Sequence, residues 1–465
     1  MKNAFLLLTL GVCCLLLLPA LFMSGMFSDG LLYASVSKNY ALGSGTFWHQ
    51  TFSATSHTAF HEQPPLMFFL QGIFFRVLGY SMYTERIYSL VAAILCILLL
   101  HRCWQIITSS RSGNNSWLPV LFWFTMPVTF YVFINNMEEC TMTVFVLAAT
   151  VHLLRVYFQH KNEMLHLLLA GGFLLLAGLT KGIQGMFLLS APFLWWIATR
   201  KTGFLITLRQ SLLLAMVPFV FVIFALLSPE IYGSLKAYFA SRLGSTFSFY
   251  KTGSRFHILY ELLLDSLPMI IMIAILVLAK RKIIFSEWKK IKNIIVFFLL
   301  LAAAGIFPLM ITLEQRGFYL VPALPFLAIA SALFIAPGME ELHEKIIRHK
   351  MLATSIRIAG ICFIAGSVIL TIKLAGQPKR DGEKMQDLAC IAAQTGEHIT
   401  LLTTDNIYLD WGFNGYAMRN HGISITSNHT IADRWLVLEK TDPVPDGYQK
   451  IRLATEKYDL YKKLP

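Results

Sequence analysis

Acidic and basic side chains of this sequence gather at the ends of long apolar stretches. Asp29 is the first acidic residue of the chain and follows the apolar run 4–27 by only two positions. A carboxylate can act as a general base, while lysine and arginine can neutralise a departing phosphate. The set therefore suits a reaction in which a hydroxyl loses a proton while an anionic group leaves. Its members are Asp29, His57, His61, Glu62, Glu138, Glu139, Lys181, Glu230, Lys236, Arg242, Lys251, Arg255, Glu314 and Arg316.

Each of these residues also has a purely structural interpretation. Asp29 can stabilise the N-terminus of a helix through the helix dipole. The segment Glu62-Gln63-Pro64-Pro65 has the acid-then-proline order of a helix start. Four others can begin a helix or extend to lipid head groups, namely Glu138, Glu139, Lys181 and Arg316. Taken on the residues alone, both interpretations stay open.

The composition is that of a membrane protein. Of 465 residues, 56% are hydrophobic and 14% are charged, whereas soluble chains carry about a quarter charged residues. From Gly376 onward there are 11 Lys and Arg against 12 Asp and Glu, which leaves 28 against 14 for the preceding part. That excess favours basic cytoplasmic loops and contact with the lipid bilayer, and no basic–aromatic pattern indicates nucleic acid. The seven cysteines show neither metal-ligand spacing nor a disulfide framework.

Apolar stretches predict eleven membrane spans, with the N-terminus in the cytoplasm and the C-terminus outside. A further stretch, 66–79, is too short to cross, and we expect it to lie along or dip into the outer surface. The basic loop 280–293 marks the cytoplasmic side. The first run is interpreted as an uncleaved span because it is long and lacks a cleavage site. The predicted spans are 4–27, 84–103, 117–134, 139–157, 165–180, 183–199, 210–228, 258–279, 294–312, 318–336 and 353–375.

The segment after Asp29 is too polar to re-enter lipid. Ser28 can cap a helix there, and Gly43 can end it. Leu32, Val36 and Tyr40 would share one face of this helix. Such a helix would lie in the membrane interface and hold Asp29 at the height of the head groups.

The tail, residues 376–465, has a different pattern. Short β-rich runs alternate with turn signals such as Asp442-Pro443 and Asp446-Gly447. These runs are HITLLTT, RWLVLEK, YQKIRLA and KYDLYKK. We therefore expect a small α/β domain outside the membrane.

Four segments, in order, resemble the signatures of a known superfamily: SDGLLYASVSKN, FHEQPPL, GLTKG and QRGFYLVPALP. The superfamily is that of the GT-C membrane glycosyltransferases, which includes the lipid A aminoarabinose transferases and the protein O-mannosyltransferases. The resemblance covers roughly residues 1–375. It implies an α-helical polytopic fold of about 11 to 13 spans, with the first outer loop at 28–65. It also implies transfer of a sugar from a polyprenyl-phosphate carrier to an extracytoplasmic acceptor, usually with inversion.

Residue by residue, the resemblance implies roles for three acids. Asp29 matches the expected catalytic base, although Gly30 stands where relatives often have a second acid. Glu62 matches the acid before Pro-Pro, and Glu139 matches the acid that begins a later span.

The other matched positions concern the donor and the surroundings of these acids. Lys181 matches the Lys of the Lys-Gly turn, and Arg316 with Tyr319 match a pair expected to meet the carrier phosphate. Gln63 replaces a charged residue that is frequent in relatives. His61 can compensate for that replacement, and Glu138 is the alternative to Glu139.

The sequence is compatible with several cofactors, acceptors and functions. No ligand spacing demands a metal, although the outer carboxylates could hold a divalent ion. The acceptor is a protein, lipid A or a growing glycan. Alternative functions are a carrier-lipid flippase or transporter, a glycan polymerase or ligase, and a membrane-anchored binding module. The expected location is the inner (plasma) membrane, with the reaction outside.

Overall fold

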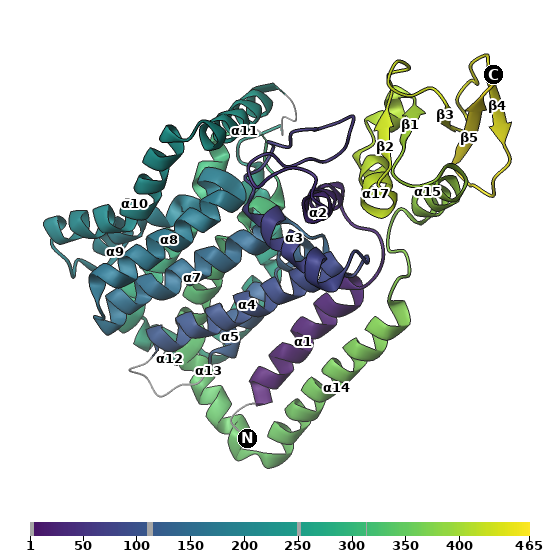
Figure 1. Cartoon of the computed structure of the whole chain (residues 1–465). Helices are drawn as coiled ribbons and strands as arrows, with labels where there is room; N and C mark the ends of the chain where they lie inside the picture. Colours follow the sequence, from purple (N-terminus) through teal and green to yellow (C-terminus); the bar gives the residue numbers. More distant parts are fainter. Residues whose placement is uncertain (1–3, 109–114, 249–252, 313) are drawn as a thin grey trace. The chain divides into compact units, whose positions relative to one another are not determined.

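The computed structural model describes residues 4–108, 115–248, 253–312 and 314–465 (Figure 1). The chain forms two compact units. Unit 1 comprises Met1–Pro19, Ser89–Ile134 and Glu138–Lys373. Unit 2 comprises Ala20–Tyr88, Asn135–Met137 and Leu374–Pro465.

Unit 1 is helical. Its helices include the ends of α1 and α4 that it shares with unit 2. In chain order they are α1 (Ala4–Leu21), α4 (Thr84–Ile107), α5 (Trp117–Phe124), α6 (Pro127–Ile134), α7 (Glu138–Gln159), α8 (Glu163–Lys181), η1 (Gly182–Ser190), α9 (Ala191–Thr199), α10 (Phe204–Leu227), α11 (Pro229–Ser248), α12 (His257–Ile306), η2 (Phe307–Ile311), η3 (Gly317–Leu320), α13 (Leu324–Arg348) and α14 (Lys350–Leu374).

Eight helical segments among the described residues are long and apolar enough to cross a membrane, or nine if the bent pair α5–α6 is one span. One of them, His257–Ile311, has 55 residues and would measure ~80 Å as a straight helix, far more than a bilayer core of ~30 Å. Another, Glu163–Thr199, has 37 residues and includes the turn after Lys181.

Both long segments fold back on themselves. In α12 the backbone leaves helical geometry at Lys280. Gly317 lies beside Glu261, Gly305 lies beside Ala323, and Gly338 lies beside Lys280. The two halves of α12 therefore run in opposite directions, with Lys280 at the far end. Likewise, the backbone of Ala177 adjoins Gly185 across the turn that follows α8.

If each folded segment counts as two passes, the nine candidates become eleven. These eleven correspond one for one to the predicted stretches, so the predicted polytopic helical fold is confirmed. Within unit 1, α7 and α8 pack side by side (Figure 1).

Unit 2 contains α2 (Ser28–Ala41) and α3 (Leu66–Leu78), which pack against each other. The predicted helix after Asp29 is present, but the predicted cap is wrong. Phe27 occupies the N-cap position without a side-chain hydrogen bond, and Ser28 is the first helical residue. Gly43, with φ +90°, follows the end of the helix as expected. Because residues 30–31 and 33–37 are buried by protein, α2 is more than a surface helix.

The tail in unit 2 forms a five-stranded sheet of order β2-β1-β3-β5-β4. β1 is parallel to both β2 and β3, whereas β5 is antiparallel to β3 and β4. The four predicted strands are confirmed, and β2 is an addition. The elements are α15 (Gly382–Thr395), β1 (Thr400–Thr403), α16 (Asp405–Tyr408), α17 (Trp411–His421), β2 (Ser424–Thr426), β3 (Trp435–Glu439), β4 (Tyr448–Ile451) and β5 (Tyr458–Lys463).

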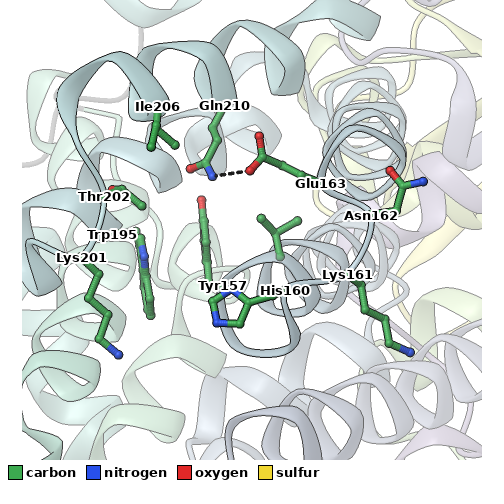
Figure 2. Close-up of a pocket in the computed structure, with 11 residues that line it drawn as sticks. Tyr157, His160, Lys161, Asn162, Glu163, Trp195, Lys201, Thr202, Ile206 and Gln210 are labelled. Atoms are coloured by element: carbon green, nitrogen blue, oxygen red, sulfur yellow. Dashed lines mark hydrogen bonds between the residues drawn. The ribbon is translucent and has the colours of Figure 1, made fainter.

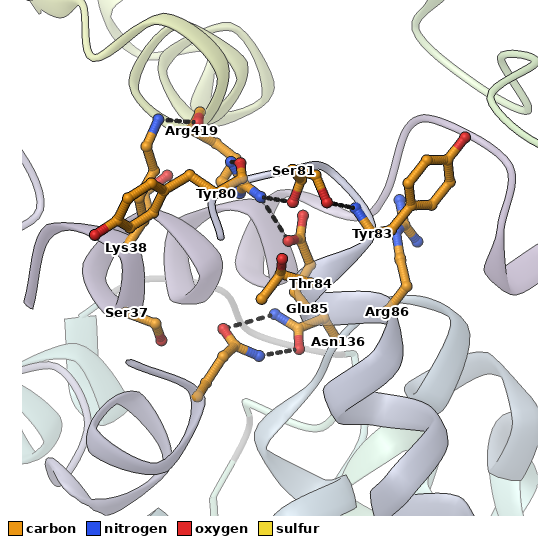
Figure 3. A network of polar contacts seen from close by, with 12 residues as sticks. Ser37, Lys38, Tyr80, Ser81, Tyr83, Thr84, Glu85, Arg86, Asn136 and Arg419 are labelled. Carbon is orange, nitrogen blue, oxygen red and sulfur yellow. Dashed lines mark hydrogen bonds and ion pairs between the residues drawn. The ribbon is translucent and has the colours of Figure 1, made fainter. Parts of the chain in front are cut away.

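The core of the tail extends onto α2. Leu31 joins the apolar cluster that contains Phe413, Tyr416 and Val437. A buried ion pair adds a polar link, since Arg419 of α17 lies 2.6 Å from Glu85 and donates to the Ser81 carbonyl oxygen (Figure 3). The tail therefore folds together with residues 20–88.

Candidate functional site

Lys181, the last residue of α8, lies beside the two acids that begin α7. Its Nζ is 2.7 Å from Glu139 Oε1 and 3.5 Å from Glu138 Oε2. Lys181 is 7% exposed and both glutamates are 0% exposed. The antiparallel packing of the two helices places the start of one beside the end of the other. Counted formally, the two carboxylates and the ammonium carry a net charge of −1.

Aromatic rings complete the cluster. Lys181 Nζ lies 5.3 Å from the centre of the Tyr319 ring and 5.8 Å from that of Phe318. Gln184 donates a hydrogen bond of 2.8 Å to the Tyr319 carbonyl oxygen, which fixes η3 against η1. Burial, opposed by the charge of Lys181, raises the pKa of Tyr319 to about 12. The Tyr319 hydroxyl therefore keeps its proton at neutral pH.

The glycine of the Lys-Gly turn, Gly182, is required for steric reasons. Gly182 has φ +68°, and a Cβ atom there would lie 2.1 Å from the Tyr238 hydroxyl oxygen. Tyr238 belongs to α11, a helix that lies between two of the predicted spans, 210–228 and 258–279. The Pro229-Glu230 start, with a proline and an acid in the first turn, was a usable signal for that helix.

Arg316 is exposed and directly precedes η3. Its carbonyl oxygen accepts a hydrogen bond of 3.0 Å from the Tyr319 amide, so the backbone links the two matched residues. Beside them, a Cβ atom on Gly317 would lie 3.1 Å from Glu261 Oε2. The cation Arg316 thus lies at the surface of the loop after α12, and Glu261 of α12 lies beside the same loop.

Asp29 lies in the first turn of α2 in unit 2 and is partly exposed. Asn135 holds this turn, because its Oδ1 accepts a hydrogen bond of 2.9 Å from the Phe27 amide. A Cβ atom on Gly30 would lie only 1.9 Å from the Asn135 carbonyl oxygen. This chain therefore has no room for the second acid that relatives often carry after the Asp.

Asn136 continues the same contact. It donates to the Gly30 carbonyl oxygen, and its Oδ1 accepts a hydrogen bond of 2.6 Å from Gln71 of α3. Gln71 is completely buried, so these amides fix α2 and α3 to each other. Neither asparagine was predicted to have a role; two adjacent Asn residues ahead of Glu138 were the signal.

Glu62 is oriented by a histidine. His57 Nε2 lies 2.9 Å from Glu62 Oε1, and Ser56 Oγ lies 2.9 Å from His57 Nδ1. The His57 ring also packs edge-on against Trp411 of α17, with centroids 5.3 Å apart. The Glu62 side chain is 45% exposed, so its carboxylate can meet a solvent-borne partner.

The tail holds the loop that carries this histidine. The Ala54 amide donates to Ser424 Oγ at 3.1 Å, and Thr55 Oγ1 donates to the Ile425 carbonyl oxygen at 2.7 Å. Strand β2 and α17 therefore form the support for residues 53–57.

The two accessory residues have different surroundings. Gln63 is buried, and its Nε2 lies 3.5 Å from the Tyr33 hydroxyl of α2. His61 packs edge-on against His49 at 5.6 Å. Burial and the nearby His49 lower the pKa of His61, which favours its neutral form.

The structure thus brings Glu138, Glu139, Lys181 and Tyr319 together in unit 1, and it places Asp29 and Glu62 in unit 2. Within the described ranges, no group of three or more His, Cys, Asp or Glu residues is arranged to hold a metal.

Residues 62–232 match the family described as dolichyl-phosphate-mannose-protein mannosyltransferase. The crystal structure of ArnT from Cupriavidus metallidurans bound to undecaprenyl phosphate aligns with a TM-score of 0.66 and 13% identity, over 99% of this chain and 98% of that one. The oligosaccharyltransferase of Archaeoglobus fulgidus in its apo form aligns with a TM-score of 0.53 and 10% identity, over 94% of this chain and 70% of that one. In sequence, no curated protein matches.

These similarities show the fold: the chain has the fold of ArnT and of the oligosaccharyltransferase, as expected from the GT-C resemblance. Together with the family match over residues 62–232, they support the resemblance seen in the sequence, that of a glycosyltransferase of the type that uses lipid-phosphate carriers.

Proposed function

We propose that this protein transfers a sugar from a polyprenyl-phosphate carrier to an acceptor outside the membrane, with inversion at the anomeric carbon. The main support is the likeness to ArnT along nearly the whole of both chains, because that protein was crystallised with undecaprenyl phosphate. The family match over residues 62–232 supports the same kind of reaction.

In the proposed reaction, Asp29 is the general base. It takes the proton from an acceptor hydroxyl, whose oxygen attacks the anomeric carbon from the face opposite the carrier. A new C–O bond forms while the bond from the anomeric carbon to the phosphate oxygen breaks. The bonding electrons leave with the polyprenyl phosphate, a good leaving group, so no strong general acid is required. The partly exposed place of Asp29 in the first turn of α2 fits this role.

The carrier phosphate meets Arg316 and Tyr319 in this proposal. Arg316 is exposed, and the Tyr319 hydroxyl keeps a proton that it can donate to a phosphate oxygen. Lys181 contributes to donor binding from behind the Tyr319 ring. Its charge is already shared with Glu138 and Glu139, so it acts through the position of that ring rather than as an isolated cation.

Glu139 and Glu62 have separate tasks. Glu139, with Glu138 as the accessory acid, keeps Lys181 ionised and in place. Glu62, oriented by His57, accepts hydrogen bonds from sugar hydroxyls of the acceptor or the donor. Gln63 and His61 shape the same loop. The protein would act in the inner membrane, with the first loop and the tail on the extracytoplasmic side.

Purified protein in proteoliposomes tests the reaction. We would supply radiolabelled sugars on polyprenyl monophosphate, with membrane extract as the acceptor, and follow label that moves from the carrier to another molecule. Label that crosses the bilayer while still attached to its carrier would instead indicate a flippase. Activity only with pyrophosphate-linked oligosaccharides would indicate a polymerase or ligase. The anomeric configuration of the product, measured by NMR, tests inversion.

A further inference from the structure

A cavity lies in unit 1, at the other end of α7 from Glu138. It has a volume of about 320 Å³. It sits where α7 and α9 end and where α8 and α10 begin. Since α7 has 22 residues, this place is ~30 Å along the helix from the Lys181 cluster. The cavity is therefore separate from the proposed sugar-transfer site.

The cavity wall carries two buried polar atoms that lack a hydrogen-bond partner. The hydroxyl of Tyr157 and Oε1 of Gln210 are both unpaired, although Tyr157 is 6% exposed and Gln210 is 3% exposed. In Figure 2 the Tyr157 hydroxyl points toward the Gln210 amide. Burying such groups without partners is costly, so a ligand that satisfies them would be favoured.

The orientation of both groups is fixed by their neighbours. The Tyr157 ring stacks on Trp195 with centroids 4.7 Å apart and an interplanar angle of 5°. Gln210 Nε2 donates to Glu163 at 3.1 Å, and that carboxylate is also paired with Arg209. Since the amide nitrogen is already engaged, Gln210 offers an acceptor, and the ligand must bring its own O–H or N–H donor.

The opening of the cavity is basic. Lys161 and Lys201 are exposed and lie on opposite sides of Tyr157 and His160 (Figure 2). The connecting segments, residues 160–162 and 200–203, contain no acidic residue, and the only acid of the lining, Glu163, is neutralised by Arg209. An anion is therefore favoured over a cation or a zwitterion.

The surroundings are those of a membrane surface. The cavity lies at the ends of helices long and apolar enough to span a bilayer. Ile206 lines it and is 44% exposed, and the adjacent Leu205 is 78% exposed, as expected of side chains that face lipid. The volume is at the small end of ligand pockets, which suits a head group rather than a whole lipid.

We propose that this cavity binds the head group of an anionic phospholipid, namely a phosphodiester that carries free hydroxyls, such as phosphatidylglycerol. The phosphate would lie at the opening between Lys161 and Lys201. A head-group hydroxyl would donate to Gln210 Oε1, and the Tyr157 hydroxyl would bind a head-group or phosphate oxygen.

Native mass spectrometry of the full chain tests this proposal. The protein would be incubated with equal amounts of phosphatidylglycerol, phosphatidylethanolamine and phosphatidylcholine that share the same acyl chains. The wild type should retain phosphatidylglycerol preferentially. Y157F should retain about twofold to tenfold less, because the loss of one hydrogen bond lowers binding by about that factor. The double variant K161Q/K201Q should lose preference for the anionic lipid.

The matched control is K289Q/K292Q, which removes two exposed lysines of α12 that do not line the cavity. It should behave as the wild type. Equal losses in the two double variants would overturn the proposal, since the preference would then be general surface attraction. The proposal is also overturned if Y157F retains as much lipid as the wild type, or if no lipid is retained.

Soluble glycerol 3-phosphate distinguishes a lipid from a free anion. We expect it to raise the unfolding temperature of wild-type protein less than phosphatidylglycerol does in nanodiscs. An equal rise would overturn the assignment to a lipid and indicate a soluble phosphate ester. Unfolding temperatures in pure phosphatidylcholine check that Y157F folds. If Y157F does not fold, the lipid preference of K161Q/K201Q tests the proposal.

Discussion

Replacing Lys181 by methionine should strongly destabilise the protein. The ammonium is 7% exposed and faces two carboxylates that are completely buried. Removing one partner of a buried ion pair lowers the free energy of unfolding by about 3–5 kcal/mol, because the other charge stays buried without compensation. Here both acids lose their contact with Lys181, so the free energy of unfolding of K181M should fall by an amount within that range. The formal charge of the three side chains changes from −1 to −2.

The double variant K181M/E139Q restores the formal charge of −1, so we expect it to recover part of the lost stability. K345M is the matched control, because Lys345 also pairs with an acid, Glu341 at 2.6 Å, but is 61% exposed. Exposed pairs contribute about 0–1 kcal/mol. The assay is unfolding of all variants in one detergent, followed by circular dichroism. Equal effects of K181M and K345M, or no recovery in the double variant, would refute the reasoning.

Three further predictions concern unit 2. Gly30→Ala should lower the unfolding temperature and the rate of sugar transfer, because a Cβ atom there would lie 1.9 Å from a backbone carbonyl oxygen. Gly172→Ala is the control and should lower neither, because the space around Gly172 is open. Equal unfolding temperatures of the two variants would contradict this prediction. Arg419→Met should lower the free energy of unfolding by about 3–5 kcal/mol, because the buried Glu85 loses its ion-pair partner. Thermal unfolding of the double variant Arg419→Met/Glu85→Gln should show that part of this stability is recovered. Burial and two nearby arginines lower the pKa of Lys379 to about 7. Above pH 7 the unfolded chain therefore binds more protons than the native protein, so the unfolding temperature should rise from pH 7 to pH 9. Lys379→Met should make this rise smaller. If the variant shows the same dependence of unfolding temperature on pH as the wild type, the burial of this amine is contradicted.

Periodic features of this fold could be predicted from the sequence. The apolar runs predicted the membrane passes because a helix must be apolar over its whole length to lie in lipid. The strands β1, β3, β4 and β5 follow from runs rich in β-branched and aromatic residues. Strand β2, Ser424–Thr426, has only three residues and is too short to show a period.

Contacts that depend on irregular backbone could not be predicted. The Lys-Gly turn was foreseen, but its partners were not, because they depend on the antiparallel packing of α7 and α8. His57 reaches Glu62 from a left-handed backbone conformation, φ +49°, inside a loop without periodicity. The reason for Gly30 lies in the carbonyl oxygen of Asn135, 105 positions further along the chain.

The most direct measurement is sugar transfer by an Asp29→Asn variant. The change keeps the shape of the side chain and removes its ability to accept a proton at neutral pH. We predict normal expression, an unfolding temperature close to that of the wild type, unchanged binding of the polyprenyl-phosphate donor, and loss of transfer by a factor of about 100 or more. Transfer at the wild-type rate by the folded variant would contradict the assignment of Asp29 as the base.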